Sequence, residues 1–158
     1  MAAASDRIAR ITLDERTVVR RKPEIEHERA VAIADLLQDN NFAPASGAKG
    51  PFHVHLGIEE GRLVLDIRDK AGKSLERALL SLLPLRSIVK DYFLVCESYY
   101  NAVKTASPQR IEAIDMGRRA LHDEGSAMLR ERLAERVAVD FNTARRLFTL
   151  VCVLHIRG

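Results

Sequence analysis

The sequence contains no tryptophan, only five phenylalanines and three tyrosines, and no apolar run that could cross a membrane. Its longest nearly apolar stretch, residues 147–156, has ten residues, whereas a spanning helix needs about 20. Residues 1–5 lack the basic start and apolar run of a secretory signal. These absences exclude a membrane-spanning helix, and we expect no membrane association and a cytoplasmic location.

Sequence motifs that carry chemistry are also absent. The chain has no GxSxG nucleophile turn, no P-loop, no GxGxxG and no HExxH. The two cysteines, Cys96 and Cys152, lie inside apolar helical patterns, which predicts buried free thiols rather than a disulfide or a reactive thiol. No catalytic residue can be assigned, and we expect no cofactor.

Charge of one sign does not dominate the chain. Lysine and arginine number 25 against 22 aspartates and glutamates, for a net charge of +3. The one three-residue basic run, residues 20–22, is followed at once by Glu24, Glu26 and Glu28. Nucleic-acid binders concentrate basic charge and interleave aromatic side chains. A nucleic-acid partner is therefore disfavoured.

The apolar pattern changes near Pro84. Before it apolar residues mostly alternate, as in half-buried strands, and after it they recur every three or four residues, as in amphipathic helices. We therefore predict one α+β domain over residues 1–158, strand-rich over 7–83 and helical over 84–158, with residues 1–6 disordered. The expected architecture is a small antiparallel sheet, a meander plus an N-terminal strand, packed against the helical half.

Several elements can be placed within the strand-rich part. Alternation predicts a strand over residues 7–14, and acidic residues in a first turn favour a helix over residues 24–40. Prolines and glycines mark residues 43–51 as a loop. Three alternating runs separated by two turns then predict the meander, with its strands at residues 52–58, 62–68 and 75–82.

The helical part begins with Pro84, which suits a first helical turn. Ser107 followed by Pro108 predicts the start of the next helix, and Gly125 with Ser126 predicts a break or bend in it. Residues 137–139 are expected to form a short strand, and Asp140 or Asn142 to cap a central last helix that ends near residue 155.

Two arginine pairs are the candidate anion-binding residues: Arg118 with Arg119, and Arg145 with Arg146. Guanidinium groups bind phosphate bidentately. The second pair falls near the start of the last helix, where cations oppose the helix dipole unless negative partners are present. The simpler interpretation is salt bridges to neighbouring carboxylates.

Two histidines, His53 and His55, share one face of a predicted strand, and Asp66 of the next strand could join them as a third metal ligand. The simpler interpretation is a solvated sheet face. Three tyrosines on one helix, Tyr92, Tyr99 and Tyr100, would suit the centre of a protein interface if the core does not need them.

Five segments of the chain resemble the bacterial uncharacterised protein family UPF0262: EHERAVAIADLL (26–37), RLVLDIRD (62–69), IVKDYFLVCESYY (88–100), IEAIDMGRRALHDEGS (111–126) and DFNTARRLFTLVCVLHIRG (140–158). The resemblance covers nearly the whole chain. It implies no activity, cofactor or catalytic residue, so it assigns no role to any position.

Two hypotheses of function follow. The first is a binding or regulatory module that acts through a protein partner or a homodimer. The second is an enzyme or sensor that binds a phosphorylated small molecule through the arginine pairs. Whether the chain is an enzyme stays open at this stage.

Overall fold

The computed structural model describes residues 5–15 and 22–155. Residues 1–4, most of the segment predicted to be disordered, lie outside the described part, as do residues 16–21. Asp6 is described, and its carbonyl accepts a hydrogen bond from the Phe42 amide at 2.8 Å. The elements along the chain are β1 (Ile8–Leu13), α1 (Pro23–Gln38), β2 (Phe42–Pro44), β3 (Phe52–Glu59), β4 (Arg62–Arg68), β5 (Ser74–Ser81), a 3-10 turn (Leu83–Leu85), α2 (Arg86–Thr105), α3 (Pro108–Leu133), β6 (Val137–Val139) and α4 (Phe141–His155).

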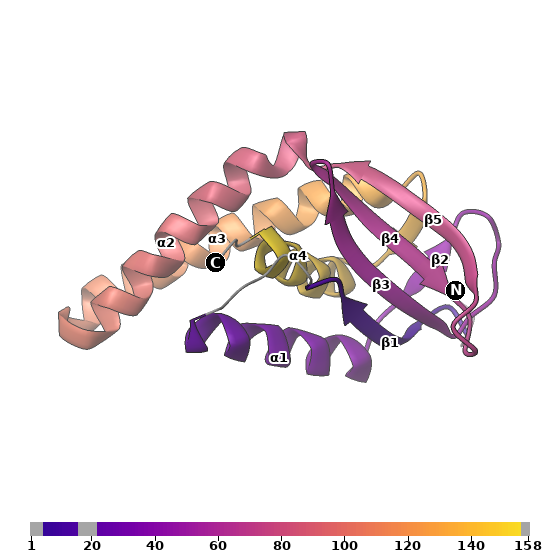
Figure 1. Cartoon of the computed structure of the whole chain (residues 1–158). Coiled ribbons are helices and arrows are strands. Elements are labelled where there is room, and N and C mark those ends of the chain that lie inside the picture. Colours follow the sequence, from indigo (N-terminus) through magenta and orange to yellow (C-terminus); the bar gives the residue numbers. More distant parts are fainter. Residues whose placement is uncertain (1–4, 16–21, 156–158) are drawn as a thin grey trace.

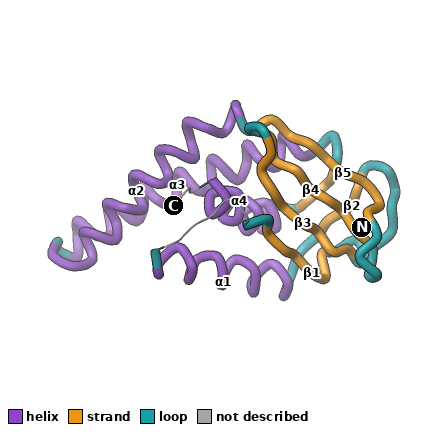
Figure 2. Tube along the Cα trace, in the orientation of Figure 1, coloured by secondary structure: helices purple, strands orange, loops and turns teal. Residues whose placement is uncertain are grey.

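The α+β class is confirmed, with strands gathered at one end and helices at the other (Figure 2). The main sheet has the order β1-β3-β4-β5, and β3, β4 and β5 form the predicted antiparallel meander. Glu60 and Gly61 both take positive φ, 52° and 75°, as in the tight hairpin turns whose twist matches that of the strands. Alternation therefore predicted both the pairing and the buried face of these strands.

The N-terminal strand corrects one expectation. β1 pairs with β3 in parallel, not antiparallel, because the chain travels back through α1 before it enters β3. The Asn40 side chain fixes this return, since its amide nitrogen donates to the carbonyls of Ile8 and Leu36 and its oxygen accepts from the Ile8 amide. One polar side chain thus ties the end of α1 to β1.

A second, two-stranded sheet pairs β2 with β6. The prediction of a strand at residues 137–139 is confirmed. The prediction of a loop over residues 43–51 is wrong at its start, because residues 42–44 form β2. Its register pairs Phe42 with Val139, across a long sequence separation.

Helix starts agree with the sequence signals, whereas the predicted break in α3 is wrong. Ser107 caps α3 by accepting from the Arg110 amide, and Asp140 caps α4 by accepting from the Thr143 amide at 2.8 Å. α3 continues uninterrupted through Gly125 and Ser126. Ser126 satisfies its hydroxyl within the helix by donating to the His122 carbonyl at 2.6 Å.

The last helix lies at the centre of the helical layer, as its apolar pattern predicts. Figure 1 shows α4 between α1 and the long α2–α3 hairpin, which extends away from the sheet. α4 packs against α1, α3 and β3, and most of its side chains are buried. The core is one cluster that joins the inner face of the sheet to α4. α1, α2 and α3 are therefore held around one central helix, and this arrangement forms the site described next.

Candidate anion-binding site

A hollow of about 380 Å³ lies among the four helices. It brings together all four arginines of the two sequence-predicted pairs, together with residues that the sequence did not single out. Its lining residues are His27, Glu28, Val31, Ala32, Asp35, Tyr92, Arg118, Arg119, His122, Arg145, Arg146 and Thr149. Two segments some 27 residues apart in the chain, from Arg118 to Arg145, thus supply one cationic wall.

Helix geometry explains how these side chains meet. Residues four apart lie on the same helix face, so Arg118 stands beside His122 on α3, and Arg145 beside Thr149 on α4. The two faces are joined at the base of the hollow, where His122 Nε2 lies 2.8 Å from Thr149 Oγ1. The packing of α3 on α4 therefore aligns the two arginine pairs.

The α3 arginines share one carboxylate. Asp115 accepts from Arg118 at 2.5 Å and from Arg119 at 2.9 Å. The Arg118 guanidinium also lies 4.6 Å from the ring centroid of Tyr99, a cation–π distance. The hydrogen bond from Arg118 and the two positive charges hold the pKa of Asp115 below its ordinary value. These salt bridges agree with the simpler interpretation of this pair, although one carboxylate serves two cations.

The α4 arginines have weaker partners. Arg145 Nε lies 3.5 Å from Asp123 Oδ1, and Arg146 Nε lies 3.8 Å from Asp35 Oδ2. Arg145 Nε is buried and has no hydrogen-bond partner among the described residues. A buried donor left unbonded costs about 1–3 kcal/mol. Within the described part of the chain, one donor of the Arg145 guanidinium, its Nε, is therefore left without a hydrogen bond.

His122 sits beneath the arginines as a neutral side chain. Burial lowers its pKa to about 4, and the positive charge of Arg145 acts in the same direction. Its ring packs against Tyr92 and Phe148, each with a centroid distance of 5.3 Å. The Thr149 hydroxyl lies within hydrogen-bond distance both of His122 Nε2, at 2.8 Å, and of the Arg145 carbonyl, at 3.3 Å. A buried neutral imidazole thus links α3 and α4 under the hollow.

The opposite wall of the hollow belongs to α1 and is acidic. Glu28 and Asp35 line it, and Glu28 Oε1 accepts from the Tyr100 hydroxyl at 2.6 Å. The burial of Tyr100 and its bond to Glu28 raise the pKa of the phenol, so the hydroxyl keeps its proton. The hollow therefore has a cationic side and an anionic side.

The three tyrosines do not form one exposed patch. Tyr92 is 4% exposed and belongs to the core, with its ring against Phe148. Tyr99 and Tyr100 are half-buried and stack edge-on, where they hold Arg118 and Glu28. Tyr92 is thus a core residue that also lines the hollow, whereas Tyr99 and Tyr100 contact two of the side chains that line it.

The sequence-predicted histidine site lies elsewhere, on the outer face of the main sheet. A register line runs Thr12, His55, Asp66, Arg77 across the four strands. The Thr12 hydroxyl lies 3.0 Å from His53 Nε2 and 2.7 Å from His55 Nδ1. Both histidines are therefore engaged by a neutral hydroxyl.

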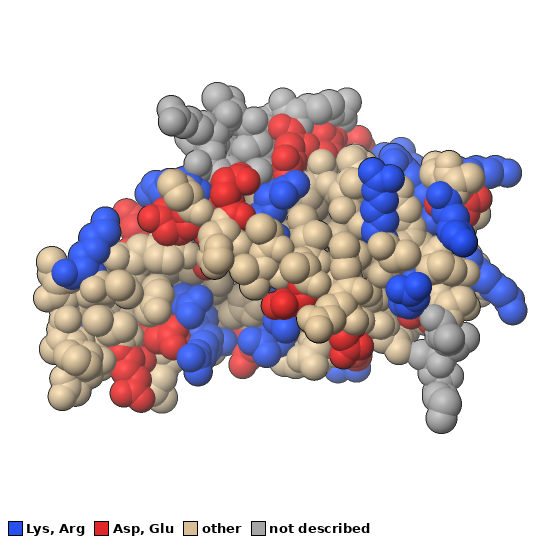
Figure 3. Space-filling view, turned by 90° about the horizontal axis from the view of Figure 1, so that it is seen from below, with Lys and Arg blue, Asp and Glu red and all other residues tan. Residues whose placement is uncertain are grey.

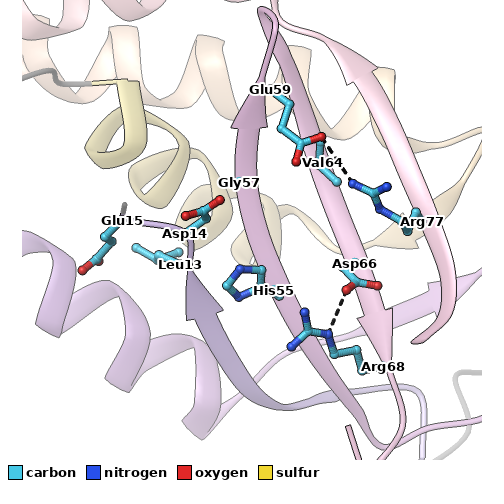
Figure 4. Close-up of a pocket in the computed structure, with 10 residues that line it drawn as sticks. All are labelled: Leu13, Asp14, Glu15, His55, Gly57, Glu59, Val64, Asp66, Arg68 and Arg77. Atoms are coloured by element: carbon cyan, nitrogen blue, oxygen red, sulfur yellow. Dashed lines mark hydrogen bonds and ion pairs between the residues drawn. The ribbon is translucent and has the colours of Figure 1, made fainter. Parts of the chain in front are cut away.

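Asp66 is held by other partners on that face. Arg68 and Ser74 donate to its two oxygens at 2.8 and 2.6 Å, and these hydrogen bonds lower its pKa although burial opposes the shift. Figure 4 shows Asp66 directed to Arg68, with a second ion pair between Arg77 and Glu59. Within residues 5–15 and 22–155, no group of three or more histidine, cysteine, aspartate or glutamate side chains could hold a metal. The metal hypothesis gains no support here.

Charge on the surface is mixed. Figure 3 shows basic and acidic side chains interspersed over the face seen from below, and no single basic patch stands out on that face. Of the basic run at residues 20–22, only Lys22 is described. No described helix is both long enough and apolar enough to cross a membrane.

Comparison with known proteins identifies the family of the chain. The model of the uncharacterised protein family UPF0262 matches residues 5–157. A UPF0262 protein of Rhodospirillum rubrum is 60% identical over 154 residues, covering 98% of this chain and 95% of its own. UPF0262 proteins of Rhodopseudomonas palustris (57% over 155 residues, 98% and 95% covered) and of a Bradyrhizobium species (59% over 156 residues, 98% and 92% covered) are similar over the same range. The chain belongs to UPF0262. No solved structure matches it.

The UPF0262 family description names no ligand or reaction, so the chemistry of this member has to be argued from its site. Sequence reasoning found the four arginines but missed His122, Glu28 and Asp35. The helical spacing from Arg118 to His122 was a usable signal. Nothing in the sequence indicated that α1 would face the arginines, because that depends on how α1 packs on α4.

Proposed function

We propose that this UPF0262 protein binds a small phosphorylated molecule in the hollow between its helices, and that it acts as a binding or sensing module. The observation that carries the proposal is the convergence of two arginine pairs, Arg118 with Arg119 and Arg145 with Arg146, on one hollow. A phosphate group offers several oxygens to such donors and the charge to balance them.

Physical chemistry favours phosphate over a solitary carboxylate as the bound group. A guanidinium donates two parallel hydrogen bonds to a phosphate or carboxylate. Four guanidinium groups supply more donors than the two oxygens of one carboxylate can accept. A phosphate dianion has more oxygens than a carboxylate and carries more negative charge. The hollow is open to solvent-borne ligands, and its volume of about 380 Å³ suits a small ligand.

Binding without turnover is the simpler role for this geometry. A nucleophile needs an adjacent general base with a suitable pKa. His122 is the imidazole at the base of the hollow. Its Nε2 is engaged with the Thr149 hydroxyl at 2.8 Å, and burial lowers its pKa to about 4. His122 thus supports the α3–α4 packing beneath the ligand, and we assign the arginines to binding alone.

Calorimetric titration with inorganic phosphate at constant ionic strength tests the proposal. The unmodified protein should bind phosphate, and Arg145→Ala should weaken binding at least tenfold. The matched control is Arg77→Ala, which removes an exposed arginine of the sheet face and should leave binding unchanged. Absence of phosphate binding to the unmodified protein, or an equal loss in both variants, would overturn the proposal.

Chemical denaturation of Arg145→Ala separates binding from folding. The side chain is 37% exposed and its ion pair with Asp123 is long, so its removal should cost about 0–1 kcal/mol. A loss of several kcal/mol would instead make Arg145 a structural residue. The denaturation result therefore decides whether a change in binding can be ascribed to the site.

Protein binding is a second candidate, favoured by a shallow groove at the start of α2. Val89, Phe93 and Leu94 line it, and Leu94 is 55% exposed. A partner or a second copy of the chain could bury this surface. Sedimentation velocity of the unmodified protein and of Leu94→Asp tests self-association. A monomer at every concentration in both would argue against a homodimer.

A further inference from the structure

The two walls of the hollow carry opposite charge. α3 and α4 contribute four arginines, and α1 contributes Glu28 and Asp35. If the hollow bound only an anion, the acidic wall would repel it and weaken the site. The pairing of a cationic wall with an anionic wall instead suits a ligand that carries both signs.

The walls lie close together. Arg146 Nε and Asp35 Oδ2 are 3.8 Å apart, beyond the usual reach of a hydrogen bond. At this separation the pair attracts without direct hydrogen bonding, so both groups can turn to a ligand. A ligand that reaches both walls needs only a short spacer between its two charged ends.

The acidic wall is held in place by its own contacts. Tyr100 donates to Glu28 Oε1. The negative charge of this carboxylate is delocalised over both of its oxygens. Ala32, between the two acidic residues on α1, is 4% exposed, so the helix face that bears them is fixed against the core. Both acidic residues thus line the hollow from a packed helix. Glu28 is held by its bond from Tyr100, whereas the Asp35 side chain is 42% exposed.

We propose that the ligand is a zwitterionic phosphate monoester, an aminoalkyl phosphate whose phosphate contacts the arginines and whose ammonium contacts Glu28 and Asp35. This inference rests on the proposed function and specifies its ligand class. Nucleotides with several phosphates suit the site less well, because their extra negative charge would meet the acidic wall.

The test compares O-phosphoethanolamine with ethyl phosphate, which has the same phosphate and two-carbon chain but no ammonium. Calorimetric titration at pH 7.5 should show O-phosphoethanolamine binding about fivefold more tightly to the unmodified protein, the size expected of a partly exposed ion pair. In Asp35→Asn the preference should disappear, because O-phosphoethanolamine binds less tightly while ethyl phosphate binds equally or more tightly.

Glu28→Gln provides a second variant, because the glutamine oxygen can still accept from Tyr100 and so preserve the fold. It should reduce the preference for the amine in the same way. Glu59→Gln, on the remote sheet face, is the matched control and should retain the preference. Circular dichroism confirms that each variant is folded.

The outcomes distinguish the two proposals. Equal binding of the two ligands by the unmodified protein would overturn the zwitterion proposal but not the phosphate site. The same conclusion would follow if Asp35→Asn changed the affinity for both ligands in the same direction. Failure of inorganic phosphate to bind the unmodified protein would overturn the proposed function, and the zwitterion with it. Opposite changes for the two ligands in Asp35→Asn would support the zwitterion.

Discussion

Gly125 of α3 lies against the ring of Phe148 of α4 so closely that no β-carbon fits between them. A Cβ built at Gly125 would stand 2.8 Å from Cε2 of the ring and closer still to Cε1 and Cζ. Phe148 is fully buried and in turn packs edge-on against Tyr92. The contact of α3 with α4, on which the hollow depends, therefore requires glycine at this position.

Substitution of Gly125 by alanine should destabilise the protein. The added methyl group must displace a packed ring, and overpacking of this kind costs about 1–3 kcal/mol. Gly117→Ala is the matched control in the same helix, because the nearest atom to its added Cβ is Val95 Cγ2 at 4.0 Å. It should stabilise the protein by up to about 1 kcal/mol through helix propensity. Urea denaturation measures both, and similar effects of the two changes would contradict the packing argument.

The free energy of unfolding should decrease as the pH falls from about 6.5 to about 4. Burial and the charge of Arg145 lower the pKa of His122 to about 4 in the folded protein, whereas an unfolded histidine titrates near 6.5. The unfolded state therefore takes up a proton over this range that the folded state does not. Above pH 6.5 His122 should contribute no pH dependence.

His122→Gln tests this assignment, because it removes the titrating group and keeps hydrogen-bonding capacity toward Thr149. The slope of unfolding free energy against pH should become flatter between pH 4 and 6.5. His53→Gln is the control. Burial and Arg10 also lower the pKa of His53, but His53 lies on the sheet face and does not contact the hollow. An unchanged slope in His122→Gln would show that another group dominates this pH range.

The cap of α4 should be worth about 1 kcal/mol. Asp140 Oδ1 accepts from the Thr143 amide at 2.8 Å, and removal of such a cap typically costs that amount. We expect Asp140→Ala to lower the unfolding midpoint in guanidinium chloride and Asp140→Ser, which can still accept the bond, to restore most of it. Equal losses in both variants would point to the charge of Asp140 and not to its cap.

Both thiols should resist modification in the folded protein. Cys96 and Cys152 are free and buried; burial raises the pKa of Cys96 to about 11 and that of Cys152 well above its ordinary value. Because the thiolate is the reactive form, an aromatic disulfide reagent at pH 8 should label neither at an appreciable rate until urea is added. Rapid labelling of one thiol in native buffer would show that its region opens.

The elements that the sequence predicted well are those whose pattern is local. The meander needs only alternation and two turns, and the starts of α3 and α4 need only the cap residues Ser107 and Asp140. The direction of β1 could not be predicted, because alternation identifies a buried face but not the neighbour or its polarity. β2 was missed because three residues, one of them Pro44, are too few to show a period and pair with a remote strand.

The break expected at Gly125 failed for a related reason. Glycine lowers helix propensity, but here its missing side chain admits the ring of Phe148, and this tertiary contact outweighs the local preference. The arginine pairs were visible in the sequence as pairs. Their convergence was not, and neither was the acidic wall opposite them, because both depend on helices that meet only in the folded chain.

The central position of α4 has a consequence for the order of events during synthesis. The ribosome makes this helix after α1, the main sheet and the α2–α3 hairpin, yet it packs against α1, α3 and β3. Until α4 has emerged, the surfaces of α1, α3 and β3 that pack against it stay uncovered. Incomplete chains with exposed apolar surface aggregate readily. A pause in translation before α4 would therefore lengthen the time for which this apolar surface is exposed.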